Sequence, residues 1–431
     1  MPSVLSGLPI EAVRVLVPVY VVAGLMLVVV LLPGPGRGPL RRRLAVSALV
    51  AGAGALAGAL LVWWVVDVQD VFGVAASAVI RAAAAAGGAG TALAGLAVVR
   101  GRWWRRVVAV VAVPVFLAAS ALMINRDVAY YPKLGDAFGD TGVGALVLSG
   151  EAGRSRSLVS WRAPADMPSS GSVGTVDIPG TESKFSARPA WVYLPPAART
   201  AHPPRLPVMI ALSGEPGGPS DVFLAGGLKA KLDALAAAHH GVAPIVVVPD
   251  QLGSYSANPM CLNSKLGDVA TYITVDVRDW ILRHLPVETA RRGWTVAGFS
   301  EGGTCAVQFG AGYPALFGSF VAVSPELGPF TRSVARTVRE GFDGSRAAYD
   351  AAQPIAVMRR TGHYRGTAAV YSVGALDTRY GKNAGILARV SEQVGMHTSY
   401  RRFPDLAHNW NTGAAGLEDG LQRLTSWWRL P

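Results

Sequence analysis

A serine flanked by glycines is the residue of this chain best placed to do chemistry. Residues 294–303 read Trp-Thr-Val-Ala-Gly-Phe-Ser-Glu-Gly-Gly, an apolar run that ends in Gly-x-Ser-x-Gly. This pattern predicts a strand, a sharp turn and a helix, with the Ser300 hydroxyl raised above the turn as a nucleophile. Gly298 and Gly302 would leave the room that such a turn needs. An ordinary glycine-rich turn has the same pattern, so the interpretation depends on finding chemical partners for the serine.

Two later segments supply a candidate acid and a candidate base. Asp377 follows an apolar run that ends at Gly374, and His408 follows the last such run of the chain. The order Ser, Asp, His is that of α/β-hydrolases. His408 would then take the proton of Ser300, and Asp377 would hold the imidazole. Asp405 and Glu326 remain alternative acids, since Asp377 could instead cap the helix that follows it. The other histidines are expected to be surface residues: His202, His239, His240, His284, His363 and His397.

Acyl transfer to a serine also needs N–H groups that stabilise an oxyanion. The backbone N–H of Glu301, directly after the nucleophile, is the first candidate. The loop Leu-Ser-Gly-Glu-Pro-Gly-Gly at 212–218 offers the second, where we favour the N–H of Glu215 over that of Gly214. Gly214 and Trp410, which follows His408 closely, are the predicted substrate contacts.

The two cysteines, Cys261 and Cys305, are an even count and favour a disulfide in an oxidising compartment, with two buried thiols as the alternative. No group of His, Cys, Asp and Glu has the spacing of a metal site. The loop at 213–218 lacks the Gly-Lys-Ser/Thr of a phosphate-binding loop. The sequence therefore predicts neither a metal nor another cofactor.

Short β-branched runs alternate with helical patterns after residue 171, which predicts a doubly wound α/β sheet. The expected strands are 174–178, 190–194, 207–212, 244–249, 294–297, 319–324, 368–373 and 398–403, the first two as antiparallel edge strands. The expected helices are 221–239, 272–284, 301–310, 383–394 and 417–428. The polar, arginine-rich segment 327–366 interrupts the alternation and is expected to form a cap over the site.

The first part of the chain has a different character. Hydrophobic residues make up 51% of the sequence and charged ones 16%, and the apolar excess is concentrated in four long runs. Each is long enough, or nearly so, to span a bilayer as a helix. These runs predict a four-helix transmembrane domain over 1–124, joined by a glycine- and serine-rich linker at 125–170 to a catalytic domain at 171–431. The runs are 15–32, 44–66, 75–99 and 107–124.

Arginines indicate the orientation of these runs. One cluster lies between runs one and two and another between runs three and four. By the positive-inside rule both clusters are cytoplasmic, so the catalytic domain is expected outside a multi-pass cell-membrane anchor. Residues 1–124 carry +7 of the net charge of +12, so most of the basic excess lies in the segment whose arginines set the orientation in the membrane. We therefore expect the lipid bilayer as a partner and no nucleic acid. The clusters are Arg37, Arg41, Arg42, Arg43 and Arg100, Arg102, Arg105, Arg106.

The block from about residue 172 to 428 resembles the putative-esterase family of α/β-hydrolases, which includes esterase-D-like enzymes and secreted mycolyltransferases. Its four preceding spans make the chain look more specifically like membrane-bound bacterial esterases, a group that includes hydrolases of aminoacyl-phosphatidylglycerol. The chain departs from the family at Ser213, where many relatives have His, and at Glu301, where Gln or Met is usual. The matching features are 212–218, Val-Pro-Asp at 248–250, 298–303, Asp377 and His408.

The expected function is hydrolysis of a carboxylic ester, with a lipid or a small ester as substrate. Acyl transfer to a sugar or lipid alcohol uses the same acyl-enzyme and is one alternative. A non-catalytic binding protein is the other. Glu215 and Glu301 are expected to attract a cationic acyl group, and the arginines of 327–366 to meet anionic headgroups, which favours aminoacyl-phosphatidylglycerol. The membrane could also serve only to retain the enzyme.

Overall fold

The computed structural model describes residues 3–32, 39–147 and 157–431. The chain forms two compact units, Met1–Thr141 and Gly142–Pro431. The regular elements described in the first unit are helices, with one isolated β-bridge between Pro9 and Lys133, and the second unit is built on one large sheet. The first unit continues beyond residue 124, because its last long helix extends to Val128 and a short helix, α6 (Leu134–Ala137), follows.

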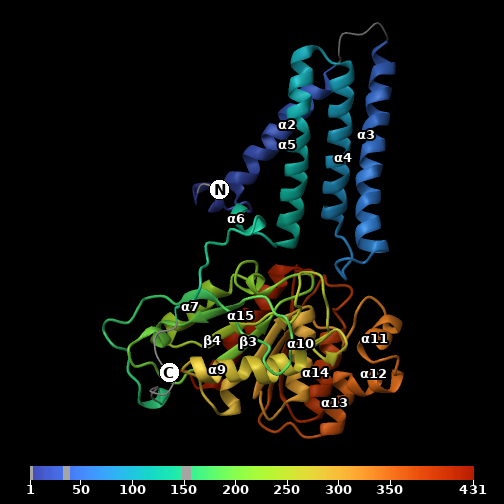
Figure 1. Ribbon diagram of the computed structural model, residues 1–431. Helices are drawn as coiled ribbons and strands as arrows, with labels where there is room; N and C mark the ends of the chain where they lie inside the picture. Colours follow the sequence, from blue (N-terminus) through green and yellow to red (C-terminus); the bar gives the residue numbers. More distant parts are fainter. Residues whose placement is uncertain (1–2, 33–38, 148–156) are drawn as a thin grey trace. The chain divides into compact units, whose positions relative to one another are not determined.

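Four helices of the first unit are long and apolar enough to cross a membrane, as the four apolar runs predict. The cytoplasmic arginines predicted from the sequence lie where α3 begins and where α4 ends and α5 begins; Arg37 lies outside the described residues. A four-residue helix, α1 (Ser3–Ser6), precedes the spans. The four candidate spans are α2 (Val13–Leu31), α3 (Leu40–Val62) with its π-helical continuation η1 (Trp63–Val68), α4 (Ala78–Arg100) and α5 (Trp103–Val128) (Figure 1).

Glycines allow α3 and α4 to pack at backbone contact. A Cβ on Gly54 would collide with the carbonyl oxygen of Gly88, and a Cβ on Gly58 with that of Ala84. Small residues spaced in this way let two membrane helices approach closely and gain dispersion contacts that lipid cannot supply. The glycines of α3 are therefore part of a specific helix–helix contact.

The second unit confirms the doubly wound α/β fold. Its eight strands have the order β1-β2-β4-β3-β7-β8-β9-β10. The pairs β1–β2 and β2–β4 are antiparallel, and all the other neighbours are parallel. The six central strands are buried along their whole length, as a sheet covered on both faces requires. The strands are β1 (Ser172–Val176), β2 (Ala190–Leu194), β3 (Val208–Leu212), β4 (Ile245–Val248), β7 (Trp294–Phe299), β8 (Ser319–Val323), β9 (Ala368–Gly374) and β10 (His397–Phe403).

Helices lie on both faces of this sheet (Figure 1). On one face α15 (Trp410–Trp428) packs on the central strands and on α7 (Leu228–Ala238). On the other, α10 (Glu301–Gly312) packs on β7 and β8, and α14 (Asn383–Gln393) on β9 and β10. The remaining elements are the π-helical η6 with α8 and α9, a two-stranded sheet, and short 3-10 turns: α8 (Val269–Thr271), η6 (Tyr272–Val277), α9 (Arg278–His284), β5 (Asn263–Ser264), β6 (Gly267–Asp268), η3 (Leu158–Ser160), η4 (Pro196–Arg199), η5 (Pro219–Val222) and η7 (Arg291–Gly293).

Helix α15 begins seven residues before the predicted start at Leu417. The side chain of Asn409 caps it by accepting a hydrogen bond from the N–H of Thr412. The glycines that argue against a helix here are packing positions: a Cβ on Gly416 would lie 2.5 Å from Ser372 Oγ, and one on Gly420 2.6 Å from Val321. Their lack of side chains brings the helix close to the sheet and sets the position of the loop that carries His408.

The insertion at 327–366 folds into three helices, α11 (Val334–Gly341), α12 (Arg346–Ala352) and α13 (Pro354–Thr361). Its last part belongs to the helix layer and not to a cap, because Met358 is fully buried and α13 packs on α10 and α14. Three of its arginines pair with acids of the same helices, which reduces the basic surface expected from the sequence. These pairs are Arg336 and Arg339 with Glu340, and Arg346 with Asp350.

Candidate active site

Ser300 occupies a strained turn between β7 and α10. Its backbone has φ 58° and ψ −118°, a conformation that side-chain-bearing residues rarely adopt. The turn fits because a Cβ on Gly298 would collide with the backbone of Gly302, and one on Gly302 with that of Leu212. Ser300 donates its N–H to Val323 on β8 at 2.9 Å. Strand, turn and helix thus present the serine as Gly-x-Ser-x-Gly predicts.

The predicted base and acid lie in hydrogen-bonding range of this serine and of one another. His408 Nε2 is 2.9 Å from Ser300 Oγ, and His408 Nδ1 is 2.7 Å from Asp377 Oδ2. The other carboxylate oxygen of Asp377 accepts the N–H of Tyr380 at 2.9 Å. Because the carboxylate can only accept, Nδ1 carries the proton and Nε2 is free to take the one from Ser300.

The alternative acids lie elsewhere. Asp405 is exposed on the turn after β10. Glu326 donates its backbone N–H to Thr304 Oγ1 at 3.0 Å, and its carboxylate accepts the hydroxyl of Tyr380. The geometry therefore favours Asp377 as the partner of His408.

Asp377 is held in its charged form despite its burial. Burial works to raise the pKa of this carboxyl, but the hydrogen bond and charge of His408 and the N–H of Tyr380 outweigh it, so the pKa lies below its ordinary value. A carboxylate that stays ionised can stabilise the imidazolium that forms when His408 takes a proton.

Aromatic rings hold the imidazole from two directions. The ring of Phe299 lies 5.0 Å from that of His408, and the ring of Tyr380 lies 4.5 Å from it. Trp410 packs in turn on Phe299, at 5.1 Å, and is only 5% exposed. Trp410 therefore supports the wall behind His408, and its burial in the first turn of α15 leaves it little surface for the substrate contact predicted from the sequence.

The oxyanion donors predicted from the sequence lie on two elements beside Ser300. Glu301 begins α10, so its N–H is one of the unpaired donors at a helix N-terminus. On the other side, a Cβ on Gly214 would be 3.4 Å from Ser300 Cβ, which places the 213–218 loop against the nucleophile. An oxyanion formed at Ser300 would lie between these two backbones.

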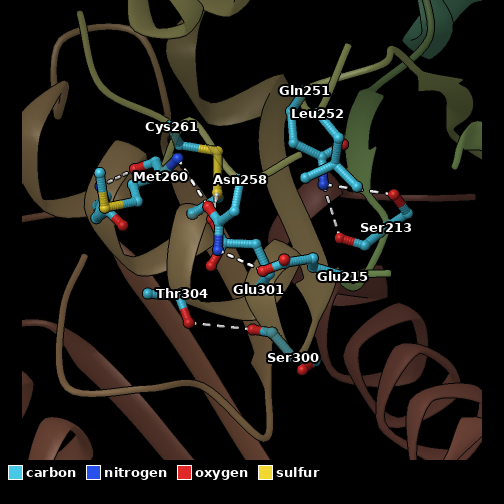
Figure 2. Close-up of a disulfide and its surroundings, with 12 residues drawn as sticks. Ser213, Glu215, Gln251, Leu252, Asn258, Met260, Cys261, Ser300, Glu301 and Thr304 are labelled. Atoms are coloured by element: carbon cyan, nitrogen blue, oxygen red, sulfur yellow. Dashed lines mark hydrogen bonds between the residues drawn. A yellow bond between two sulfur atoms is a disulfide. The ribbon is translucent and has the colours of Figure 1, made fainter. Parts of the chain in front are cut away.

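Side chains that the sequence did not single out hold this loop. Gln251 donates to the carbonyl of Ser213 at 2.7 Å (Figure 2). Arg188 donates to the carbonyl of Gly217 at 3.0 Å and pairs through two nitrogens with the fully buried Asp250. Asp250 could be noticed as a charge directly after a buried strand. Arg188 and Gln251 carry no such signal, because only the tertiary structure brings them to the loop.

The side chain of Glu301 points away from the chemistry. It is 5% exposed, and a carboxyl oxygen lies 3.2 Å from the sulfur of Cys305 (Figure 2). Burial raises the pKa of this carboxyl well above its ordinary value, and the charges of Glu326 and Glu215 raise it further. The neutral, protonated form of the carboxyl is thereby favoured. The sequence led us to expect that Glu301 attracts a cation, but a neutral buried carboxyl is not suited to that role. Glu215 and Glu326 are part-exposed, so their carboxylates are the better candidates for attracting a cation.

A disulfide joins Cys261 to Cys305 on α10, as predicted. Together with Glu301 these sulfurs form the one grouping of metal-type ligands in the described ranges, and the disulfide already engages both of them. A cavity of about 710 Å³ lies at the opposite end of the sheet from Ser300 and contains no part of the site. Its lining includes Trp161, Pro207, Glu288, Gly293 and Trp428.

Comparisons with known proteins identify the family of the second unit. Residues 185–424 match the model of the putative esterase family. An uncharacterized protein of Corynebacterium glutamicum is 34% identical over 232 residues, which are 53% of this chain and 54% of that protein, so the chain spans about half the length of this curated relative.

Solved structures share the fold at lower identity. A ferulic acid esterase is 17% identical with a TM-score of 0.52, covering 60% of this chain and 99% of its own. An S-formylglutathione hydrolase from Agrobacterium tumefaciens is also 17% identical, with a TM-score of 0.50, covering 66% of this chain and 100% of its own. The chain therefore belongs to the putative esterase family, and residues 185–424 are a serine hydrolase domain of the α/β-hydrolase fold.

Proposed function

We propose that this chain is a membrane-anchored serine esterase that cleaves carboxylic esters through an acyl-enzyme on Ser300. The observation that carries the proposal is the continuous hydrogen-bonded series from Ser300 through His408 to Asp377. The description of the family as putative esterases supports the same reaction.

The proposed reaction has two halves, acylation and deacylation of Ser300. In acylation His408 Nε2 takes the Ser300 proton as Oγ attacks the ester carbonyl, and the oxyanion is stabilised by the N–H groups of Glu301 and Glu215. The imidazolium, stabilised by Asp377, then gives its proton to the departing alcohol. In deacylation His408 takes a proton from the water that attacks the acyl-enzyme, and then gives it to Ser300 Oγ as the acid leaves, which restores the free enzyme.

The direct test is covalent labelling with a fluorophosphonate, together with turnover of a p-nitrophenyl ester. The wild type should label and turn over, and Ser300→Ala should do neither. A matched change, Ser254→Ala on an exposed loop, should leave both unchanged. Wild-type protein that neither labels nor cleaves any ester would refute the proposal in favour of a non-catalytic role.

The catalytic unit is placed outside the membrane in this proposal. Four membrane-spanning helices and the arginines at two of their connections support that orientation. An ester lipid of the outer surface is then within reach of an enzyme that could not diffuse away from it.

Among such lipids, aminoacyl-phosphatidylglycerol is the substrate that we favour. Glu215 and Glu326 are part-exposed carboxylates near the nucleophile, and both raise the pKa of Glu301 by their charge. An ammonium group on the acyl part of the ester would be attracted to that region. A long fatty acyl chain would gain nothing from it.

Purified protein in vesicles of phosphatidylglycerol should release the amino acid from alanyl- or lysyl-phosphatidylglycerol. Glu326→Gln should lower that rate more than the rate on a neutral short-chain ester. Equal losses on both would remove the electrostatic argument, and cleavage of neutral esters alone would remove the aminoacyl assignment. Transfer of the acyl group to an added alcohol, in place of release, would identify a transferase.

A further inference from the structure

Asn258 lies outside the catalytic series but uses both ends of its side chain near it (Figure 2). Its Nδ2 donates to Glu215 Oε2 at 2.5 Å and to the carbonyl of Phe330 at 3.2 Å. Its Oδ1 accepts the N–H of Met260 at 2.8 Å. One amide thus joins the oxyanion loop, the start of the insertion and its own loop, so none of the three can shift alone without breaking a hydrogen bond.

The loop that carries Asn258 is fastened to the helix that carries the nucleophile. Cys261 is bonded to Cys305 on α10, and Gln308, also on α10, donates to the carbonyl of Met260 at 3.0 Å. Met260 and Cys261 both have positive φ, at 61° and 52°. Such residues persist only where their surroundings fix them, and the disulfide and the Gln308 hydrogen bond do so here.

These contacts form one continuous series, which we call the brace. It runs from Glu215 through Asn258 and Met260 to the disulfide and α10. Glu215 supplies one proposed oxyanion donor and the first residue of α10 supplies the other. An oxyanion hole weakens when a donor is displaced, by up to about a hundredfold in rate for a shift of about 1 Å, because its strength depends on donors fixed before the reaction.

We infer that Asn258 is a positioning residue which, together with the Cys261–Cys305 disulfide, fixes the spacing of the two oxyanion donors. The inference rests on the proposed esterase function. Disturbing the brace should weaken stabilisation of the tetrahedral intermediate while leaving the binding of the substrate ester in place.

The test compares Asn258→Asp, which removes the donated hydrogen bonds and faces Glu215 with a like charge, with the pair Cys261→Ser and Cys305→Ser. Asn263→Asp is the matched control, because Asn263 is exposed and the hydrogen bonds of its side chain among the described residues are with Thr271. Each full-length protein is assayed on a neutral p-nitrophenyl ester, and the melting temperature is recorded. An alkyl boronic acid reports the oxyanion hole directly, since its tetrahedral adduct with Ser300 places an oxygen there.

Asn258→Asp and the cysteine pair should each lower kcat about tenfold to a hundredfold, with KM within about threefold of the wild type, because a misplaced donor costs less than a deleted one. Boronate affinity should fall by the same factor as kcat/KM. Reductant should bring the wild type to the level of the cysteine pair. Asn258→Asp added to that pair should cost little more, as expected for residues that act as one unit.

Unchanged kcat in Asn258→Asp, or losses that multiply in the combined variant, would overturn the inference. So would a loss confined to KM. Should Asn258→Asp fail to fold, the cysteine pair and the reductant arm decide the matter alone. Failure of the proposed function looks different, since the wild type itself would then show neither turnover nor labelling.

Discussion

His408 has a partner at each ring nitrogen and an aromatic ring against it in two directions. Asp377 and Ser300 lie at the nitrogens, and Phe299 and Tyr380 supply the rings. Each neighbour restricts the imidazole to one orientation and one tautomer. The catalytic contribution of this histidine therefore depends on residues that do not touch the substrate.

Asp377→Asn should lower kcat about 10³- to 10⁴-fold with little change in KM, because an amide can donate to Nδ1 and stabilise the wrong tautomer. Steady-state kinetics on a p-nitrophenyl ester measure the effect. Asp405→Asn is the control and should behave as the wild type. The reverse result, with Asp405→Asn inactive and Asp377→Asn active, would show that the acid has been misassigned.

Glu301→Gln should make the protein more stable than the wild type, by a margin that grows as the pH rises. The buried carboxyl has a raised pKa in the folded state, so between its unfolded pKa of about 4.5 and the folded one the native state holds a proton that the unfolded chain has released. The free energy of unfolding then falls as pH rises, by up to about 1.4 kcal/mol per pH unit. Glutamine has no such dependence.

Urea unfolding of the two proteins from pH 5 to pH 8 measures the difference, which should grow with pH in favour of the variant. The exposed Glu392→Gln change serves as the control and should give a curve parallel to the wild type. Parallel curves for Glu301→Gln as well would mean that the buried carboxyl is already charged in the folded protein.

At the scale of elements, close backbone packing accounts for what sequence patterns miss. The central strands were predictable because β-branched runs buried on both faces have a plain signature, and so were Ser300 and Asp377, which follow two of them. His408 was predictable as well, although the strand before it, β10, is a largely exposed edge strand. The early start of α15 was not, because Gly413, Gly416 and Gly420 look like helix breakers until the sheet beneath them is known. Arg188, Gln251 and Asn258 were likewise hidden, since their partners lie 29, 38 and 43 positions away.

Gly416→Ala should destabilise the hydrolase unit by about 1–3 kcal/mol, because its Cβ would press on Ser372 and Val323 in a packed layer. Gly312→Ala is the matched control. Gly312 ends α10 and a Cβ there meets nothing within 4 Å, so this change should stabilise by about 0.5–1 kcal/mol. Denaturant midpoints distinguish the two; equal effects of the two alanines would contradict the packing argument.

At the scale of the molecule, the chain consists of an apolar helical unit, residues 1–141, and a hydrolase unit, residues 142–431. Each unit carries a net charge of +6, so the shorter helical unit has about twice the charge per residue. Composition alone reveals both units, since apolar runs of spanning length and alternating strand and helix patterns are each distinctive. The arginines at the ends of the apolar helices predict which side of a membrane the hydrolase unit occupies.

A reporter enzyme that works only outside the cytoplasm, fused after Pro431, should be active, because the positive-inside rule places both arginine clusters in the cytoplasm. Replacing Arg41, Arg42 and Arg43 with glutamine should lower that activity by relaxing the bias. A cytoplasmic reporter active at the same position in the wild type would invert the topology.

The disulfide has a consequence for where the enzyme becomes competent. Cysteines stay reduced in the cytoplasm and pair only in an oxidising compartment. If the brace through Asn258 is needed for full turnover, a newly made chain would be a poor catalyst until its hydrolase unit had crossed the membrane and Cys261 had met Cys305. Export would then activate the enzyme. Lipids facing the cytoplasm would be protected because the reduced enzyme turns over slowly, and also because the active enzyme lies on the other side of the membrane.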